Sequence, residues 1–214
     1  MGKVTSDISM SLDGFIAGPN VGIERPLGEG GERLHQWIYG LTSFRKLHSL
    51  DPRTGKPFST GGETNRDDEV LAEMFQNTGA IVMGRRMFDT GEKPWGDNPP
   101  FHMPVFVLTH HFREKLVKEG GTTFIFAADG IESALKQAKT AADNKDVAVA
   151  GGANIIQQCL KAGLLDEMQI HLVPVLLGDG IRLFENLGPR HIELERIRVI
   201  ESPHVTHLRF RVTK

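Results

Sequence analysis

Alternating apolar and polar positions open the chain and predict a β-strand. The apolar side chains stand at even positions, which is the period that buries one face of a strand. These positions are Val4, Ile8, Met10 and Leu12. Asp13-Gly14 follows and favours a turn. We therefore expect the first strand to end at Asp13.

From residue 67 onward, short apolar segments alternate with helical patterns. Helices are expected at 67–75, directly after Gly84, at 129–142 with Asp129 as its cap, and at 153–162. Strands are expected at 80–83, 104–109, 122–127, 146–150 and 168–177. Such short, continuously apolar strands between helices are typical of a mainly parallel sheet with helices on both faces. The pattern predicts an α/β fold in one domain, residues 1–214.

The last two expected strands differ from the others. Residues 192–200 and 205–213 alternate in polarity and are joined by a short turn segment. This arrangement predicts an antiparallel hairpin at the end of the chain.

A long segment, residues 18–66, interrupts this regular pattern. It is rich in glycine and proline, and a helical stripe is visible only over 33–50. Loops of this length inside a compact domain are usually functional. We expect a loop-rich insertion that could act as a lid over a binding site.

Composition narrows the classes of function. The formal net charge of −2 gives no electrostatic footprint for nucleic acid. No apolar segment approaches the roughly 20 residues that span a bilayer, and the N-terminus lacks a signal-peptide pattern. With Cys159 as the single cysteine, no intramolecular disulfide or multi-thiolate zinc site can form. We expect a soluble, cytoplasmic protein that binds a small molecule, without nucleic acid or membrane as partner.

The histidines do not predict a metal site. His204 and His207 would face opposite sides of the expected hairpin, and the adjacent His110 and His111 have the same difficulty. We expect structural or surface roles for them. Trp95 could either form a wall of a pocket or lie in the core.

Two strand-to-helix junctions are candidate anion sites. At the first, Gly151-Gly152 leads into a helix start at Ala153, where free N–H groups and the helix dipole suit a phosphate. At the second, Arg85 and Arg86 follow Gly84, and cations at a helix start call for an anionic partner. The alternatives are a tight turn whose glycines only relieve packing, and a surface ion pair.

These motifs occur in an order that resembles one superfamily. They are Ser11-Leu12-Asp13-Gly14-Phe15-Ile16-Ala17-Gly18, Met83-Gly84-Arg85, Val107-Leu108-Thr109 and Gly151-Gly152-Ala153-Asn154, with further similarity over 164–184. The chain resembles the dihydrofolate reductase-like superfamily, and in particular the reductase domain of the bifunctional deaminase–reductase of riboflavin biosynthesis. The resemblance implies that superfamily's fold, an NADPH-dependent reductase and a homodimer.

The resemblance also assigns roles to residues. It implies nicotinamide contacts from the backbone of Ile16 and Ala17, and 2′-phosphate contacts beside Thr109. It places the adenosine-side phosphates at Gly84, Arg85 and Arg86, and the pyrophosphate at Gly151, Gly152, Ala153, Asn154 and Ile155. Asp13 matches an acidic residue at the substrate mouth, where it could orient substrate or supply a proton.

Two positions depart from the riboflavin reductases. Ala150 stands where those enzymes usually carry Glu, and Asp7 where they tend to carry Lys. Both changes remove expected groups near the substrate side, so the substrate is predicted only as small and polar, pyrimidine or pterin-like. Folate itself is disfavoured, since no buried carboxylate is evident on a helix after the first loop. The alternatives are a non-catalytic nucleotide-binding regulator and a flavin-binding relative.

Overall fold

The computed structural model describes residues 2–48, 50–58 and 61–213. The strands are β1 (Val4–Ser11), β2 (Phe15–Ala17), β3 (Thr78–Gly84), β4 (Pro104–Leu108), β5 (Leu116–Val117), β6 (Thr123–Ala127), β7 (Asp146–Val149), β8 (Glu167–Val173), β9 (Ile181–Arg182), β10 (Leu194–Glu201) and β11 (Thr206–Val212). The helices are α1 (Thr42–Leu47), α2 (Arg66–Asn77), α3 (Arg85–Trp95), α4 (Ile131–Ala142) and α5 (Ala153–Lys161), with short 3-10 helices η1 (Gly31–His35) and η2 (Glu119–Gly121).

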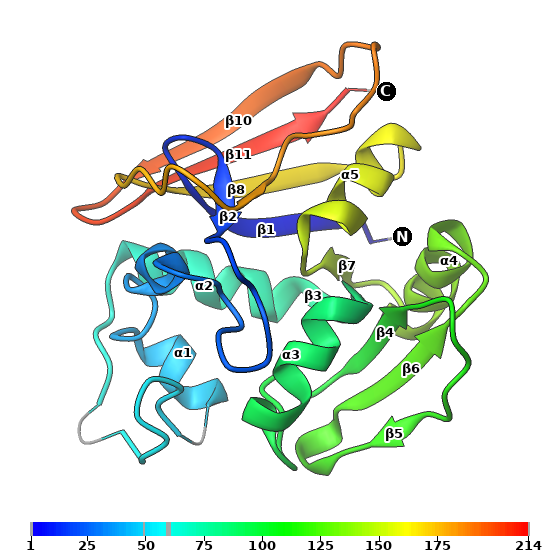
Figure 1. Cartoon of the computed structure of the whole chain (residues 1–214), viewed down its shortest axis with the longest axis horizontal. Helices are drawn as coiled ribbons and strands as arrows, with labels where there is room; N and C mark the ends of the chain where they lie inside the picture. The colour runs from blue at the N-terminus through cyan, green and yellow to red at the C-terminus, as the bar shows by residue number, and fades with distance from the viewer. Residues whose placement is uncertain (1, 49, 59–60, 214) are drawn as a thin grey trace.

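Most strands join one twisted sheet (Figure 1). Within the described residues its order is β10-β11-β8-β1-β7-β3-β4-β6-β5. The five pairings from β8 through β1, β7, β3 and β4 to β6 are parallel, whereas β11 pairs antiparallel with both β8 and β10. The predicted α/β fold with a mainly parallel sheet and a C-terminal antiparallel hairpin is confirmed. Two short strands missed by the sequence pattern, β2 and β9, pair with each other beside this sheet.

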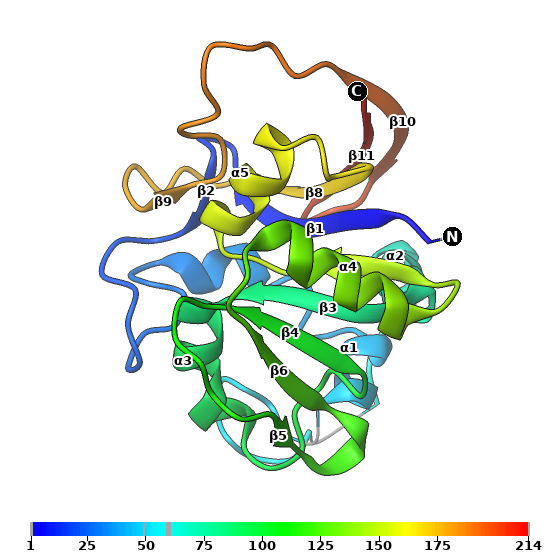
Figure 2. The same cartoon turned by 90° about the vertical axis from the view of Figure 1, so that its right-hand side faces the viewer.

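Helices cover both faces of the sheet (Figure 2). Along β3, Ala80 and Val82 pack in the apolar cluster that contains α4 and α5. The intervening Ile81 and Met83 pack in a second cluster around Phe88 of α3. Side chains of both faces of β3 are therefore buried, which explains its continuous apolar sequence.

Two local predictions were wrong. The helix expected at 129–142 has Gly130, with φ of 87°, as its N-cap, and no side-chain cap bond is present there. The strand expected at 168–177 ends at Val173, because Pro174 follows and lacks the N–H that would continue the ladder.

The described part of the insertion is loop-rich, as expected, and also contains η1 and α1. The single helix suggested over 33–50 is wrong: η1 ends at His35 and α1 begins at Thr42. Between them residues 36–40 form turns, and Leu41, which pairs with Glu63, is extended and ends the helical course. Its apolar side chains form their own cluster with α2 and β8. The buried members are Leu34, Trp37, Tyr39, Leu41, Phe44, Leu71, Val173 and Val205.

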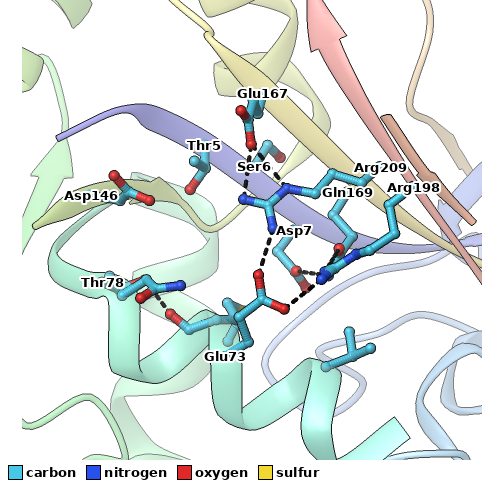
Figure 3. Close-up of a pocket in the computed structure, with 13 residues that line it drawn as sticks. Thr5, Ser6, Asp7, Glu73, Thr78, Asp146, Glu167, Gln169, Arg198 and Arg209 are labelled. Carbon is cyan, nitrogen blue, oxygen red and sulfur yellow. Dashed lines mark hydrogen bonds and ion pairs between the residues drawn. The ribbon is translucent and has the colours of Figure 1, made fainter. Parts of the chain in front are cut away.

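An ion-pair network fastens α2 to the antiparallel end of the sheet (Figure 3). The carboxylate of Glu73 accepts hydrogen bonds from Arg198 at 2.6 Å and from Arg209 at 2.7 Å. Arg209 also contacts Glu167 at 2.8 Å, and Lys3 pairs with Glu167 at 2.6 Å. Burial alone would raise the pKa of Glu73, but its two arginine partners lower it below the ordinary value.

The helices of the described chain are unlike membrane spans. None of them combines the length and the apolar composition that crossing a bilayer requires.

We predict that Glu73→Gln destabilises the fold by roughly 1–3 kcal/mol, because two half-buried arginines lose their charged acceptor. The free energy of unfolding, measured with urea, gives the value. Glu195→Gln is the matched control, since Glu195 pairs with Arg211 where both side chains are more than half exposed. It should change stability by less than about 0.5 kcal/mol. Equal effects of the two changes would contradict the proposed role of the network.

Candidate functional site

A cleft of about 540 Å³ lies where the parallel strands β3, β4 and β7 end. Its wall includes all eleven residues that the sequence predicted to bind cofactor. They are Ile16, Ala17, Gly84, Arg85, Arg86, Thr109, Gly151, Gly152, Ala153, Asn154 and Ile155. The geometry thus brings together segments that are far apart in the sequence. Their role in binding stays a prediction.

The turn between β7 and α5 holds the glycines against the end of β3. The Gly84 N–H donates to the Gly151 carbonyl at 3.0 Å, and the Ala150 N–H donates to the Val82 carbonyl at 3.0 Å. Gly151 has φ of 103°, a conformation that favours glycine, and its peptide bond to Gly152 is cis. A Cβ on Gly152 would meet no atom within 4 Å. Packing therefore does not require glycine at Gly152, whose open side lies at the cleft.

Helix α5 begins at this turn and presents its N-terminus to the cleft. Its N-cap residue, Gly152, provides no side-chain cap bond. The first N–H groups of α5 therefore lack a side-chain acceptor, and the helix dipole places partial positive charge beside them. Ala153, Asn154 and Ile155 of this first turn all line the cleft. The arrangement suits an anionic ligand such as a pyrophosphate.

The two arginines of α3 differ in their contacts. Arg85 donates to Asp89 at 2.7 Å and lies 3.5 Å from the Thr109 hydroxyl. The alternative of a surface ion pair thus describes Arg85. Arg86 also lines the cleft, yet its guanidinium group forms neither a hydrogen bond nor an ion pair with the part of the chain that the structure describes. Arg86 is the cation that an anionic ligand could engage without competing with a protein carboxylate.

Other predicted positions fall into two groups. His110 and His111, expected at the surface, are exposed and also line the cleft. Trp95 does not line it; its ring lies against Phe101 and Phe124 in the apolar cluster under α3. The core alternative for Trp95 is the one found.

Asp13 lies outside the cleft wall and anchors a loop. Its carboxylate accepts from the Ser11 hydroxyl at 2.6 Å and from the N–H groups of Gly178 at 2.7 Å and Leu177 at 3.1 Å. The Ser11 hydrogen bond is the main cause that lowers the pKa of Asp13 to about 2. The carboxyl group is ionised at neutral pH and has no proton to donate, so these contacts favour an orienting role. A catalytic role for Asp13 stays a prediction.

Asp7, one of the two departures, does not line the cleft, while Ala150, the other, does. Asp7 lines the small polar pocket beside α2 instead (Figure 3). There it accepts from Gln169 at 2.9 Å and contacts Nε2 of His171. Asp7 faces away from the cleft because its side chain alternates with that of Ile8, which lines it. The expectation that both departures lie near the substrate stays a prediction.

His171 extends this contact into a buried chain of side chains. Its Nδ1 lies 2.6 Å from Nδ1 of His207, whose Nε2 lies 2.8 Å from Asp67. Each imidazole thus contacts one carboxylate and the other imidazole. Burial lowers the pKa of His207, and the charge of His171 adds to this shift.

Helix α2 does carry buried carboxylates, contrary to expectation. Asp67 and Asp68 are about 5% and 6% exposed. Both carboxylates have hydrogen-bond partners in the protein. Asp67 contacts Nε2 of His207, and Asp68 accepts from the Ser43 N–H at 2.6 Å. Neither lines the cleft. The sequence pattern missed them because they stand among ordinary acidic residues of a helix start.

One cleft residue had no signal in the sequence. His35, at the end of η1, lines the cleft through the folding of the insertion onto β1 and β2. Its neighbours form no motif, so only the tertiary structure identifies it.

Comparisons with known proteins agree with this architecture. The family model of the RibD C-terminal domain matches residues 2–207. The uncharacterized protein YyaP of Bacillus subtilis (strain 168) is 23% identical over 207 residues, covering 94% of this chain and 90% of that protein. A solved structure from Shewanella sp. PV-4, provisionally assigned to riboflavin biosynthesis, is 22% identical with a TM-score of 0.64 and covers 99% of both chains.

A folate reductase also shares this fold. Dihydrofolate reductase from Enterococcus faecalis, solved with NADP(H), is 10% identical with a TM-score of 0.55, covering 100% of this chain and 98% of that one. The resemblance inferred from the motifs is confirmed, and the fold is dihydrofolate reductase-like. The chain belongs to the RibD C-terminal domain family.

Proposed function

We propose that this protein is an NADPH-dependent reductase of a small polar substrate. The main support is that one cleft gathers the open Gly152 position, the uncapped start of α5 and the unpaired Arg86. These features fit the pyrophosphate and the 2′-phosphate of NADPH. Membership in a family of riboflavin-type reductase domains, and a fold shared with an NADP(H)-bound reductase, support the same function.

The residues of the cleft would have different roles in binding the cofactor. The nicotinamide supplies the hydride when the cofactor is bound, and the protein positions it. The backbone of Ile16 and Ala17, which are buried in β2, forms a fixed edge at one end of the cleft. Arg86 and the first turn of α5 supply positive charge at the ends of β3 and β7. The substrate would enter the cleft beside its apolar residues, such as Ile8, Ile16 and Ala17.

Arg86→Ala should weaken NADPH binding by roughly tenfold to a hundredfold, the worth of one charge-assisted hydrogen bond of about 1.5–3 kcal/mol. NADH affinity should change little, because NADH lacks the 2′-phosphate. Calorimetric titration of both cofactors measures the two effects. The control is Arg25→Ala, an exposed arginine paired with Glu29. Equal affinity of the unmodified protein for NADPH and NADH would refute the preference.

Gly152→Val should abolish cofactor binding while the melting temperature of the free protein changes little. A branched side chain would project into the space that the pyrophosphate needs, where no protein atom stands. Gly40→Val is the matched control, since Gly40 also faces open space but does not line the cleft. Unchanged cofactor binding by the Gly152 variant would exclude the pyrophosphate site, and a loss of folding would favour the packing alternative.

Asp13→Asn tests the substrate side together with catalysis. The unmodified protein should oxidise NADPH with at least one member of a pyrimidine, pterin or simple carbonyl panel. Asn can accept only part of the hydrogen bonds that Asp13 receives, so we expect lower stability and an altered KM, with kcat largely kept. A loss of about 10²–10⁴-fold in kcat at unchanged stability would instead assign proton transfer to Asp13. Absence of any NADPH oxidation would favour the non-catalytic alternative.

A further inference from the structure

The cleft is chemically asymmetric. Its polar side chains come largely from the α3, β4 and α5 side: Arg85, Arg86, Thr90, Thr109, His110, His111, Asn154 and Gln158. The wall contributed by β1, β2, the insertion and β9 is apolar apart from one residue. The apolar members are Ile8, Ile16, Ala17, Val21, Pro26, Leu27 and Ile181. The exception among the described residues is His35.

His35 has hydrogen-bonding capacity that the protein leaves unused. Its Nδ1 is buried and forms no hydrogen bond of ordinary geometry with the described residues, although the Gly31 carbonyl lies near enough to the ring to raise its pKa. His35 is half-buried and lines the cleft. Buried polar groups are nearly always paired in folded proteins. Nδ1 is too buried to meet a ligand, so it is Nε2 of His35, on the one polar side chain that the described residues place on this wall, that a ligand in the cleft can bond.

The imidazole is neutral at physiological pH. Burial lowers the pKa of His35 to about 4; His171 contributes in the same direction, while the Gly31 carbonyl and Glu32 oppose the shift. A neutral imidazole offers one donor and one acceptor and no charge. Among the described residues, no other ionisable side chain lines the wall that β1, β2, the insertion and β9 contribute. An ionic group placed here would lose hydration without gaining a counter-ion.

We infer that His35 hydrogen-bonds the substrate, and that the substrate places an uncharged polar group, such as a ring lactam or a carbonyl, at this end of the cleft. This inference rests on the proposed reductase function. It narrows the substrate class, because the described residues place no cation on this wall of the cleft that could hold a substrate phosphate.

The neighbouring structure fixes the position of His35. Trp37, two residues further on, donates through Nε1 to Ser9 of β1 at 3.1 Å and packs its ring against His171 and His207. Leu34 is fully buried in the insertion cluster. These contacts hold η1 on the sheet, so His35 is presented by a packed element rather than by a free loop.

Two substitutions separate hydrogen bonding from packing. His35→Phe keeps a ring but removes both nitrogens, whereas His35→Gln keeps an amide near the position of Nε2. With the protein saturated with NADP⁺, binding of uracil, pterin and a cyclic ketone is measured by calorimetry, with uridine 5′-phosphate as the anionic comparison. We expect at least one neutral compound to bind, His35→Phe to weaken it about three- to tenfold, and His35→Gln to restore most of the affinity.

Cofactor binding is titrated first, which separates the two proposals. Failure of NADP⁺ to bind would refute the proposed function. Normal NADP⁺ binding with equal affinity of the neutral compound for the parent and the Phe variant would overturn the inference about His35 alone. Tighter binding of uridine 5′-phosphate than of every neutral compound, or binding of none of the four, would overturn the neutral substrate class.

The pH dependence of stability reports whether the ring is buried and neutral. The pKa of about 4 in the folded protein lies below the roughly 6.5 of an unfolded histidine. The unfolded state therefore binds more protons between these values, and stability is lost as pH falls through that window. The charged groups that act on the His35 ring, His171 and Glu32, are present in both the parent and His35→Phe, so they do not cause the difference between the two proteins. The parent should lose more stability than His35→Phe between pH 7 and pH 4; identical profiles would contradict the burial of a neutral ring.

Discussion

The parallel pairing of β1, β7, β3 and β4 is the constraint on which the cleft depends. The carboxyl ends of parallel strands lie at one edge of the sheet. At that edge the chain turns from each strand into the segment that follows it. In this protein those turns carry Gly84, Thr109 and Gly151. Two backbone hydrogen bonds tie the β7 turn to β3, so the glycines are held in place before any ligand binds. A site built from four distant segments follows from the topology alone.

The insertion supplies the other side of the cleft and depends on a different set of interactions. Its apolar cluster packs on α2 and β8, and the buried chain from Asp7 through His171 and His207 to Asp67 joins the sheet to the start of α2. The Glu73 network adds a second connection between α2 and the last strands. These contacts order the segment that carries His35, which explains why a loop-rich region can contribute a fixed residue to the site.

Much of the fold could be predicted from the sequence, because burial of strand faces leaves a strong hydrophobic period. The helices and the longer strands after residue 66, and both strand-to-helix junctions, were found in this way. Helix α1 and η1 were read as one helix, since the pairing of Leu41 with Glu63 is a tertiary contact that periodicity does not record. Asp13 could be recognised as a turn residue and a family match, but its bonds to Leu177 and Gly178 depend on a loop more than 160 residues away. His35 could not be found, because its role depends on which cleft its insertion faces.

The central claim is that the cleft at the ends of β3, β4 and β7 holds NADPH in one orientation. A crystal structure of the protein with NADP⁺ tests it most directly. The account predicts the pyrophosphate against the first turn of α5 and Gly152, the 2′-phosphate within hydrogen-bonding distance of Arg86, and the nicotinamide beside Ile16 and Ala17. A cofactor bound outside this cleft, or in it with the nicotinamide at Arg86, would contradict the account.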